Sequence, residues 1–244
     1  FEVISLGQAI SKRSGGYYDM TVGPLVNSWG FGPSGKPVKI PDRGQLQESL
    51  RRVGYTHLKL DGESGSILKD AGIYLDLSSI AKGYGVDIVA SYLQGQGVSN
   101  YLVEVGGEIR AQGYKPGGES WRLAIEAPTV GKRSIYKVIG LTDAGLATSG
   151  DYRNYYEEYG VRYSHLIQPQ TGYPIQHNLV SVTVIHPSSM TADGLATALS
   201  ILGTEAAIEV AERDNLAVLL ISKQGDEFVE YQSPAFATIV KVIK

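Results

Sequence analysis

Two oxygen-bearing side chains stand four positions apart in one apolar segment. Asp193 and Thr197 lie within residues 188–203, where the pattern predicts a helix ending at Gly203. Positions i and i+4 share a helical face, so both side chains can reach one ligand. A carboxylate and a hydroxyl form part of a hard-cation site, which Mg²⁺ would complete with carbonyl, water and phosphate oxygens. A simpler alternative is that Asp193 favours the helix dipole and Thr197 bonds back to a carbonyl.

A second segment, residues 75–87, joins a predicted strand to a predicted helix. Ser78 or Ser79 is expected to cap the helix, whose free N–H groups would suit a phosphate. Lys82 then falls in the first turn, where a cation opposes the helix dipole, and this placement favours an anionic ligand. The two glycines after Lys82 each weaken a helix by up to about 1 kcal/mol, which close approach of a ligand or of another backbone would explain. The alternative is a capped helix packed on a sheet.

A histidine stands where a strand runs into a tight turn. His165 lies in the sequence SHLIQP at residues 164–169, and turns display side chains at the surface. His165 is therefore a candidate base. Another turn is expected at Gly106–Gly107, as a bulge or tight hairpin before Glu108. The remaining histidines show no partner pattern: His57, His177 and His186.

Composition excludes several classes of protein. The 244 residues carry a net charge of −3, which argues against nucleic acid as a main partner. The chain contains no cysteine, which excludes disulfides, thiolate metal sites and cysteine nucleophiles. Residues 30–36 have P-loop spacing, but Pro37 stands where Ser or Thr should hold magnesium, so a surface loop is expected there. The chain begins at Phe1 in what reads as mid-helix, so we expect a preceding segment.

The order of the expected elements favours an α+β fold with mixed, largely antiparallel sheets and flanking helices. A Gly/Pro-rich loop is expected over 17–37, and residues 179–186 alternate like a half-buried strand. Helices are expected near 1–14, 41–53, 79–94, 190–202 and 204–213. Strands are expected near 57–60, 66–69, 73–77, 100–105, 108–113, 121–126, 135–141, 161–167, 179–186, 216–221 and 227–231.

Taken in order, six segments resemble the ApbE family of FAD:protein FMN transferases, and the resemblance covers nearly the whole chain. Any one of them is weak evidence of kinship, but six in register are strong. The segments are 14–32 (with SGGYYDMTVGPLVN and WGFG), 81–87 (AKGYGVD), 105–107 (VGG), 147–150 (ATSG), 164–169 (SHLIQP) and 192–197 (ADGLAT). The resemblance implies a single T-fold-related domain over 1–244 that lacks the family's N-terminal segment.

The resemblance also implies roles for individual residues. Asp193 and Thr197 match side-chain metal ligands, and Ala81 matches a position that contributes its backbone carbonyl. His165 matches a histidine linked to activity. One departure is Gln168, where the family usually has Asp, which puts any acid, base or bracing role there in doubt. The residues matched to the FAD-lining segments are Tyr17, Tyr18, Asp19, Ser78, Lys82, Tyr84 and Ile167.

The activity implied is Mg²⁺-dependent transfer of FMN from FAD to a Thr or Ser hydroxyl of a target flavoprotein, with release of AMP. Expected acceptors are flavoprotein subunits of membrane redox complexes. The expected location is the periplasm, on an upstream lipid anchor of the lipoprotein type. His165 and Asp193 are both candidates for the base that takes the acceptor proton. Two alternatives stay open: an Mg²⁺-dependent FAD pyrophosphatase, and a flavin-binding or redox protein that transfers nothing.

Overall fold

The computed structural model describes residues 1–33, 35, 40–129, 134–152 and 154–243. Within the P-loop-like segment 30–36, residues 34 and 36 lie outside the described ones, and residues 30–33 and 35 belong to no helix or strand. The chain divides into two compact units, each built from two stretches. Unit 1 comprises Phe1–Ser79 and Asn154–Gln176, and unit 2 comprises Ile80–Arg153 and His177–Lys244. The single domain over 1–244 that the sequence led us to expect remains a prediction.

Unit 1 combines short helices with two hairpins. Its small core contains Leu25, Trp29, Leu46 and Ile167. The helix expected near 41–53 forms as α3 and starts with a capping box, in which the Asp42 side chain accepts from the Gln45 backbone N–H at 3.0 Å. The elements are α1 (Glu2–Arg13), α2 (Gly23–Ser28), α3 (Arg43–Leu50), a 3₁₀ turn (Tyr55–His57), β1 (Leu58–Asp61), β2 (Ser66–Lys69), β8 (Tyr155–Glu158) and β9 (Val161–Ser164).

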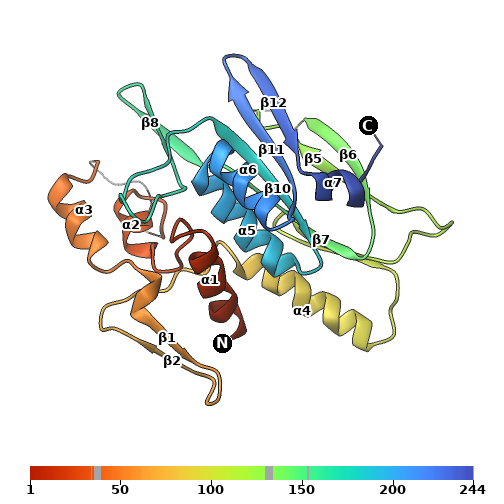
Figure 1. The fold of residues 1–244 in the computed structure, drawn as a ribbon, viewed down its shortest axis with the longest axis horizontal. Coiled ribbons are helices and arrows are strands. Elements are labelled where there is room, and N and C mark those ends of the chain that lie inside the picture. Colours follow the sequence, from red (N-terminus) through yellow and green to blue (C-terminus); the bar gives the residue numbers. More distant parts are fainter. Residues whose placement is uncertain (34, 36–39, 130–133, 153, 244) are drawn as a thin grey trace. The chain divides into compact units, whose positions relative to one another are not determined.

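Unit 2 is built around a six-stranded sheet of order β12-β11-β10-β7-β4-β3 (Figure 1). Every strand pair within the described residues is antiparallel. The strands of this sheet are β3 (Tyr101–Val105), β4 (Glu108–Gln112), β7 (Ala144–Gly150), β10 (Leu179–His186), β11 (Ala217–Gln224) and β12 (Glu227–Gln232). A second, three-stranded sheet has the order β13 (Lys241–Val242), β6 (Ile135–Leu141), β5 (Trp121–Glu126).

The six-stranded sheet is covered on both faces. Helix α5 (Ser189–Leu202) packs on β10 and β7, with α4 (Ala81–Gly95) and α6 (Thr204–Arg213) beside it (Figure 1). On the other face, side chains of β7, β10 and β11 share one core cluster with β5, β6 and α7 (Pro234–Ile239). Helix α5 is thus held between the sheet and α4, which fixes the backbone that carries Asp193 and Thr197.

Strand β10 corrects one prediction. The alternation of Val/Ile with polar groups predicted a half-buried strand over 179–186, yet Leu179–Ile185 are all buried. The polar members are buried too, because Ser181 and Thr183 share the face of Ile185, which points into the second layer. The Thr183 hydroxyl lies 2.9 Å from that of Thr148 on β7, so the two hydroxyls satisfy each other there.

Three further local predictions were wrong. Residues 17–37 were expected to be loop, but α2 forms within them, with proline in its first turn. No strand forms at 73–77. Neither Ser78 nor Ser79 caps α4, because the helix begins at Ala81 with Ile80 as its N-cap residue and no side-chain cap. The Ser79 hydroxyl instead donates to the Tyr18 hydroxyl at 3.0 Å.

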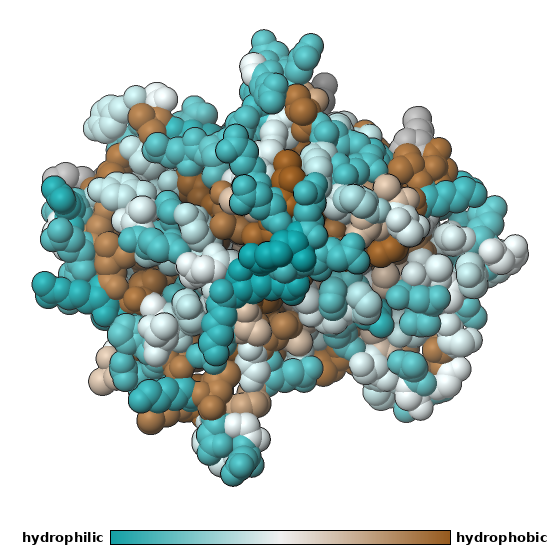
Figure 2. Space-filling view, in the orientation of Figure 1, coloured by the Kyte–Doolittle hydropathy of each residue, from teal (hydrophilic) through white to brown (hydrophobic). Residues whose placement is uncertain are grey.

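The surface mixes polar and apolar residues. On the face drawn in Figure 2, hydrophilic and hydrophobic side chains are interspersed. Within the part of the chain that the structure describes, no helix combines the length and the apolar character needed to cross a bilayer.

Candidate functional site

The first turns of α4 and α5 touch through backbone. A Cβ atom placed on Gly83 would lie 2.3 Å from the carbonyl oxygen of Ser189 and 2.7 Å from the Cα of Met190. Only glycine permits that approach. Of the two α4 glycines, Gly85 has open space around its Cβ position, so the close backbone contact expected from the sequence explains Gly83 alone.

The contact between the helices brings Asp193 to α4. Asp193 is 5% exposed, and its Oδ2 accepts a hydrogen bond from the Gly83 N–H at 3.0 Å. Burial raises the pKa of Asp193, and the Gly83 hydrogen bond and the charge of Lys82 partly offset that rise. The Gly83 bond engages one carboxylate oxygen, which leaves Oδ1 as the oxygen for a further ligand.

The other two predicted metal ligands belong to the same helices. Thr197 is one turn after Asp193 on α5 and is half-buried, and Ala81 is the exposed first residue of α4. Among the described residues, the Thr197 hydroxyl makes no hydrogen bond back to a carbonyl, so the simpler alternative for Thr197 is not observed. Three oxygen donors of this kind suit a hard cation and would not favour a soft one.

Lys82 forms an ion pair with a residue that the sequence had not singled out as a site residue. Its Nζ lies 2.5 Å from Glu108 Oε1. The Glu108 side chain is 3% exposed while that of Lys82 is 45% exposed, so the pair links a buried carboxylate to an accessible ammonium group. Glu108 begins β4 directly after the Gly106–Gly107 turn, whose positive φ values of 62° and 101° confirm the tight hairpin expected there.

A second acidic residue of α4 holds the start of α5. The Asp87 carboxylate accepts from the Ser188 hydroxyl at 2.7 Å and from the N–H groups of Ser189 and Met190 at 3.0 Å each. These amides are among the unpaired donors of the first turn of α5. Arg110 on β4 lies 3.6 Å from Asp87. Asp87 therefore fixes the helix that carries the predicted ligands.

The residues missed by sequence reasoning are thus Glu108 and Asp87. Asp87 lies inside a segment that was matched to the family and Glu108 directly follows one, but a single sequence shows neither that Glu108 is buried nor that Asp87 faces α5. The sequence did contain one indication for Glu108, because this charged residue directly follows a Gly-Gly pair, which marks a tight bend of the backbone. Among the described residues, no group of three or more His, Asp and Glu side chains could hold a metal. The predicted donor set, with one carboxylate, does not require such a group.

The predicted site residues divide between the two units. Five of them belong to unit 2: Ala81, Lys82, Tyr84, Asp193 and Thr197. In this unit the structure brings Lys82 and Asp193 together around Gly83. Tyr84 is half-buried in the second turn of α4. Six residues belong to unit 1: Tyr17, Tyr18, Asp19, Ser78, His165 and Ile167.

In unit 1, Asp19 braces a loop. Its Oδ1 accepts from the N–H and hydroxyl of Thr21 at 2.8 and 2.7 Å, and its Oδ2 accepts from the Tyr55 N–H at 2.7 Å. Burial raises the pKa of Asp19, and these hydrogen bonds oppose the rise. Tyr18 is buried and packed, whereas Tyr17 is half-buried and Ser78 is exposed. The flavin-lining role of these residues stays a prediction.

His165 stands at the end of a row of aromatic rings. Trp29, Tyr163, Tyr156 and Phe31 stack in sequence with centroid separations of 5.3, 5.3 and 5.4 Å, and His165 meets Phe31 edge-on at 6.2 Å. His165 Nδ1 lies 2.9 Å from the Asn154 carbonyl oxygen. A carbonyl oxygen can only accept, so Nδ1 carries the proton and Nε2 holds the basic lone pair of the neutral ring. The row gives a packing role to two of the 16 tyrosines.

The turn after His165 keeps its brace despite the Gln168 departure. The Gln168 side-chain oxygen accepts from the Thr171 hydroxyl at 3.3 Å, and its backbone pairs with Gly172 and Tyr173 at 2.9 Å. The bracing role left in doubt by the missing Asp is therefore filled by the amide. Ile167 is 3% exposed and packs in the core with Leu25 and Trp29, so it supports the turn from inside.

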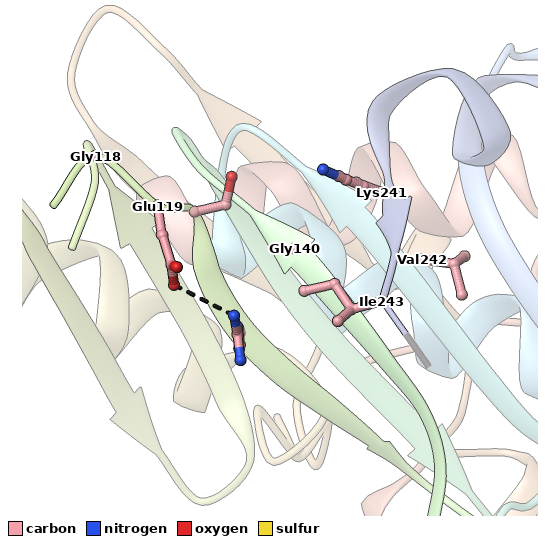
Figure 3. A pocket seen from close by; sticks show the side chains of 8 residues that line it. Gly118, Glu119, Gly140, Lys241, Val242 and Ile243 are labelled. Carbon is pink, nitrogen blue, oxygen red and sulfur yellow. Dashed lines mark hydrogen bonds and ion pairs between the residues drawn. The ribbon is translucent and has the colours of Figure 1, made fainter.

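A separate hollow of about 510 Å³ lies in unit 2 beside the three-stranded sheet (Figure 3). The ion pair between Glu119 and Arg122, 3.3 Å long, closes one side of it. None of the predicted site residues lines this hollow, whose lining is Gly118, Glu119, Ser120, Arg122, Gly140, Lys241, Val242 and Ile243.

Comparisons with known proteins agree on a class, the flavin transferases. A sequence model described as the ApbE family matches residues 1–220, and the chain belongs to this family. A Vibrio cholerae protein named FAD:protein FMN transferase is 52% identical over 222 residues, which cover 91% of this chain and 66% of that protein. A Haemophilus influenzae protein of the same name is 49% identical over 244 residues, covering 98% and 70%. The chain therefore spans about two thirds of the length of these relatives.

Solved structures give the same result for the fold. The flavin transferase ApbE from Vibrio cholerae superposes with a TM-score of 0.89 at 47% identity, covering 98% of this chain and 75% of that one. The ApbE protein from Thermotoga maritima superposes at 0.86 with 30% identity, covering 98% and 76%. The α+β class with mixed helices and antiparallel sheets, and the family expected from the sequence, are both confirmed.

Proposed function

We propose that this chain transfers FMN from FAD to a Thr or Ser hydroxyl of a target flavoprotein in an Mg²⁺-dependent reaction that releases AMP. The enzyme class rests on curated relatives that are 42–52% identical and carry the name FAD:protein FMN transferase. By that relationship the chain is a transferase that uses FAD as its substrate. The metal, the acceptor hydroxyl and the AMP product are the finer parts of the proposal.

The observation that carries the proposal is the fixed, buried carboxylate of Asp193. A carboxylate that is 5% exposed and receives one backbone N–H is costly to bury, and a bound cation would offset that cost. The donor set fits Mg²⁺, because Asp193, the Thr197 hydroxyl and the Ala81 carbonyl all offer oxygen and leave positions for water and phosphate oxygens. When bound, Mg²⁺ would neutralise negative charge that grows on the phosphate oxygens in the transition state.

The residues of the chain supply binding, charge and a base. The accessible ammonium of Lys82 is available to the phosphates of FAD, close to the first turn of α4. A base must take the proton of the acceptor hydroxyl. His165 supports that role best, because its Nδ1–H is held by the Asn154 carbonyl and its Nε2 is the basic nitrogen. The alternative base, Asp193, already accepts from Gly83 and serves the cation in this proposal.

The deciding experiment is mass spectrometry of an acceptor flavoprotein subunit incubated with the protein, FAD and Mg²⁺. The expected result is one FMN added to a single Thr or Ser, with an equal amount of AMP. The same mixture without acceptor tests the hydrolase alternative, which predicts free FMN and AMP from FAD alone. Intact FAD and an unmodified acceptor would contradict transfer and favour a binding role. A bound flavin that is reduced by an electron donor and turns over would favour a redox role.

The proposal includes a location and a class of partner. We place the protein in the periplasm on a lipid anchor upstream of Phe1, and its acceptors among the flavoprotein subunits of membrane redox complexes. What supports this is the resemblance to the family, which implies an enzyme outside the cytoplasm. Fractionation of cells that express the full-length protein would test it, and recovery in the cytoplasmic fraction would contradict it.

A further inference from the structure

Three charged groups of unit 2 form a cluster around the start of α4. Lys82 Nζ and Glu108 Oε1 are 2.5 Å apart, and Asp193 lies close enough to act electrostatically on both. Two carboxylates and one ammonium give this cluster a formal charge of −1. The carboxylate of Asp193 is held by Gly83, so the mobile member of the cluster is the long side chain of Lys82.

Glu108 is the least accessible member and the least satisfied. Its side chain is 3% exposed, and its Oε2 is buried without a hydrogen-bond partner among the described residues. A buried carboxylate oxygen left unpaired destabilises the fold unless some other interaction compensates. Packing alone gives no reason for a carboxylate here. Its direction is fixed by the Gly106–Gly107 turn, and a Cβ on Gly106 would lie 3.2 Å from the Cδ of Lys82.

We propose that Glu108 is a positioning residue that holds the Lys82 ammonium at the site and sets the charge against which cation and phosphate are bound. This inference rests on the proposed function, since it takes Asp193 as the cation ligand and Lys82 as the phosphate partner. Paired with Glu108, Lys82 adds no net charge, so a cation can bind at Asp193 without repulsion. The same pairing keeps the phosphates of FAD from binding tightly before the cation arrives.

The proposal predicts shifts of opposite sign for the two ligands. In Glu108→Gln the cluster charge rises from −1 to 0. Mg²⁺ affinity should then fall and metal-free FAD affinity should rise, each by roughly threefold to tenfold at low salt. Both shifts should shrink as salt is raised, because the groups are partly screened. If the Lys82–Glu108 pair only held α4 to the β3–β4 hairpin, Glu108→Gln would lower the affinities for Mg²⁺ and FAD together or leave both unchanged.

A second variant restores the charge without restoring the ion pair. Adding Lys82→Met to Glu108→Gln returns the cluster to −1, so Mg²⁺ affinity should recover toward that of the unmodified protein. The matched control is Glu230→Gln, which removes the carboxylate from the half-buried Lys137–Glu230 pair of 2.7 Å in the same unit. This control is expected to change thermal stability without moving either affinity.

The measurements are calorimetric titration of the unliganded protein with Mg²⁺ alone and fluorescence titration with FAD in the presence of a chelator. Opposite shifts in Glu108→Gln, with recovery of Mg²⁺ affinity in the double variant, would support the proposal. Shifts of the same sign, no shift, or a double variant weaker than the single one would overturn it. If the unmodified protein binds neither Mg²⁺ nor FAD, the proposed function fails first, and the inference fails with it.

Discussion

At the scale of single residues, the site depends on a carboxylate whose surroundings are unusual. Asp193 is buried on a largely apolar helix, yet it accepts a hydrogen bond from the Gly83 N–H and lies near the positive charge of Lys82. Position 193 therefore combines a high desolvation cost with a set of interactions that favour the charged form. A buried ionisable group that is penalised by desolvation but stabilised by a specific charged partner is characteristic of functional sites.

Replacing this carboxylate separates chemistry from folding. Asp193→Ala should abolish Mg²⁺-dependent transfer of FMN while leaving a folded protein, because the variant removes a buried charge and its main ligand oxygen together. The measurements are FMN transfer to an acceptor, Mg²⁺ titration and circular dichroism. Asp226→Ala, in the exposed β11–β12 turn, is the matched control and should transfer normally. Full activity of Asp193→Ala would refute the metal assignment.

At the scale of elements, α4 and α5 position the site through their first turns. Gly83 allows the backbones to touch, and Asp87 binds the free amides at the start of α5. Neither helix has an acidic residue in its own first turn, so the carboxylate that meets the α5 dipole comes from its neighbour. The spacing of the predicted ligands is therefore set by contacts between two helices.

The two glycines of α4 should respond in opposite ways to alanine. Gly83→Ala would place a methyl group 2.3 Å from the Ser189 carbonyl oxygen, so it should destabilise the fold by about 1–3 kcal/mol and weaken Mg²⁺ binding. Gly85→Ala has open space and should stabilise the fold by up to about 1 kcal/mol. Denaturant titration of both variants measures the difference. Equal effects at the two positions would contradict the close contact.

Removing the Asp87 carboxylate, which caps α5 from α4, should destabilise the first turn of α5. Asp87→Ala takes away the acceptor of the Ser189 and Met190 N–H groups and of the Ser188 hydroxyl. We expect a loss of about 1–2 kcal/mol, as for other helix caps. The rate of amide hydrogen exchange should increase in the first turn of α5 and stay unchanged in β12. Asp42→Ala, which removes the cap of α3 in unit 1, is the comparison and should leave exchange in α5 unchanged.

Elements with strong local signals were predictable from the sequence, and contacts between them were not. The helix at 204–213 matches α6 residue for residue, because apolar spacing and the flanking Gly203 define it locally. The i,i+4 spacing of Asp193 and Thr197 was readable for the same reason. The burial of β10 depends on a second layer from β5, β6 and α7, and the burial of Glu108 depends on Lys82, so neither follows from local pattern.

At the scale of the whole molecule, the two compact units do not follow the order of the sequence. Each unit is assembled from two stretches, and each has its own apolar core. In unit 2, His177 is the first residue after the chain returns from unit 1. Both of its ring nitrogens are buried without hydrogen-bond partners among the described residues.

His177 should make the fold sensitive to mild acid. Burial lowers the pKa of His177, although the last carbonyls of α5 and Asp151 oppose that effect. The unfolded chain then binds the proton more tightly than the folded one, so stability is full above the ordinary value of 6.5 and falls as the pH drops toward the lowered pKa.

Thermal melts between pH 8 and pH 5 measure this loss. His177→Gln stays neutral throughout and should lose less stability with acid than the unmodified protein. His57→Gln removes an accessible histidine paired with Asp70 at 2.7 Å and should retain the loss. Identical acid profiles for His177→Gln and the unmodified protein would show that His177 is not the sensitive group.

The hydrogen bond between Gly83 and Asp193 joins residues that are 110 positions apart in the chain. During synthesis, α4, β3, β4 and β7 all leave the ribosome before α5 does. The proposed cation site therefore forms only when α5, from the last third of the chain, packs onto α4. On the proposed assignment, a nascent or truncated chain that stops before Asp193 lacks the metal site, so the capacity to bind Mg²⁺ would mark the packing of α5 on α4.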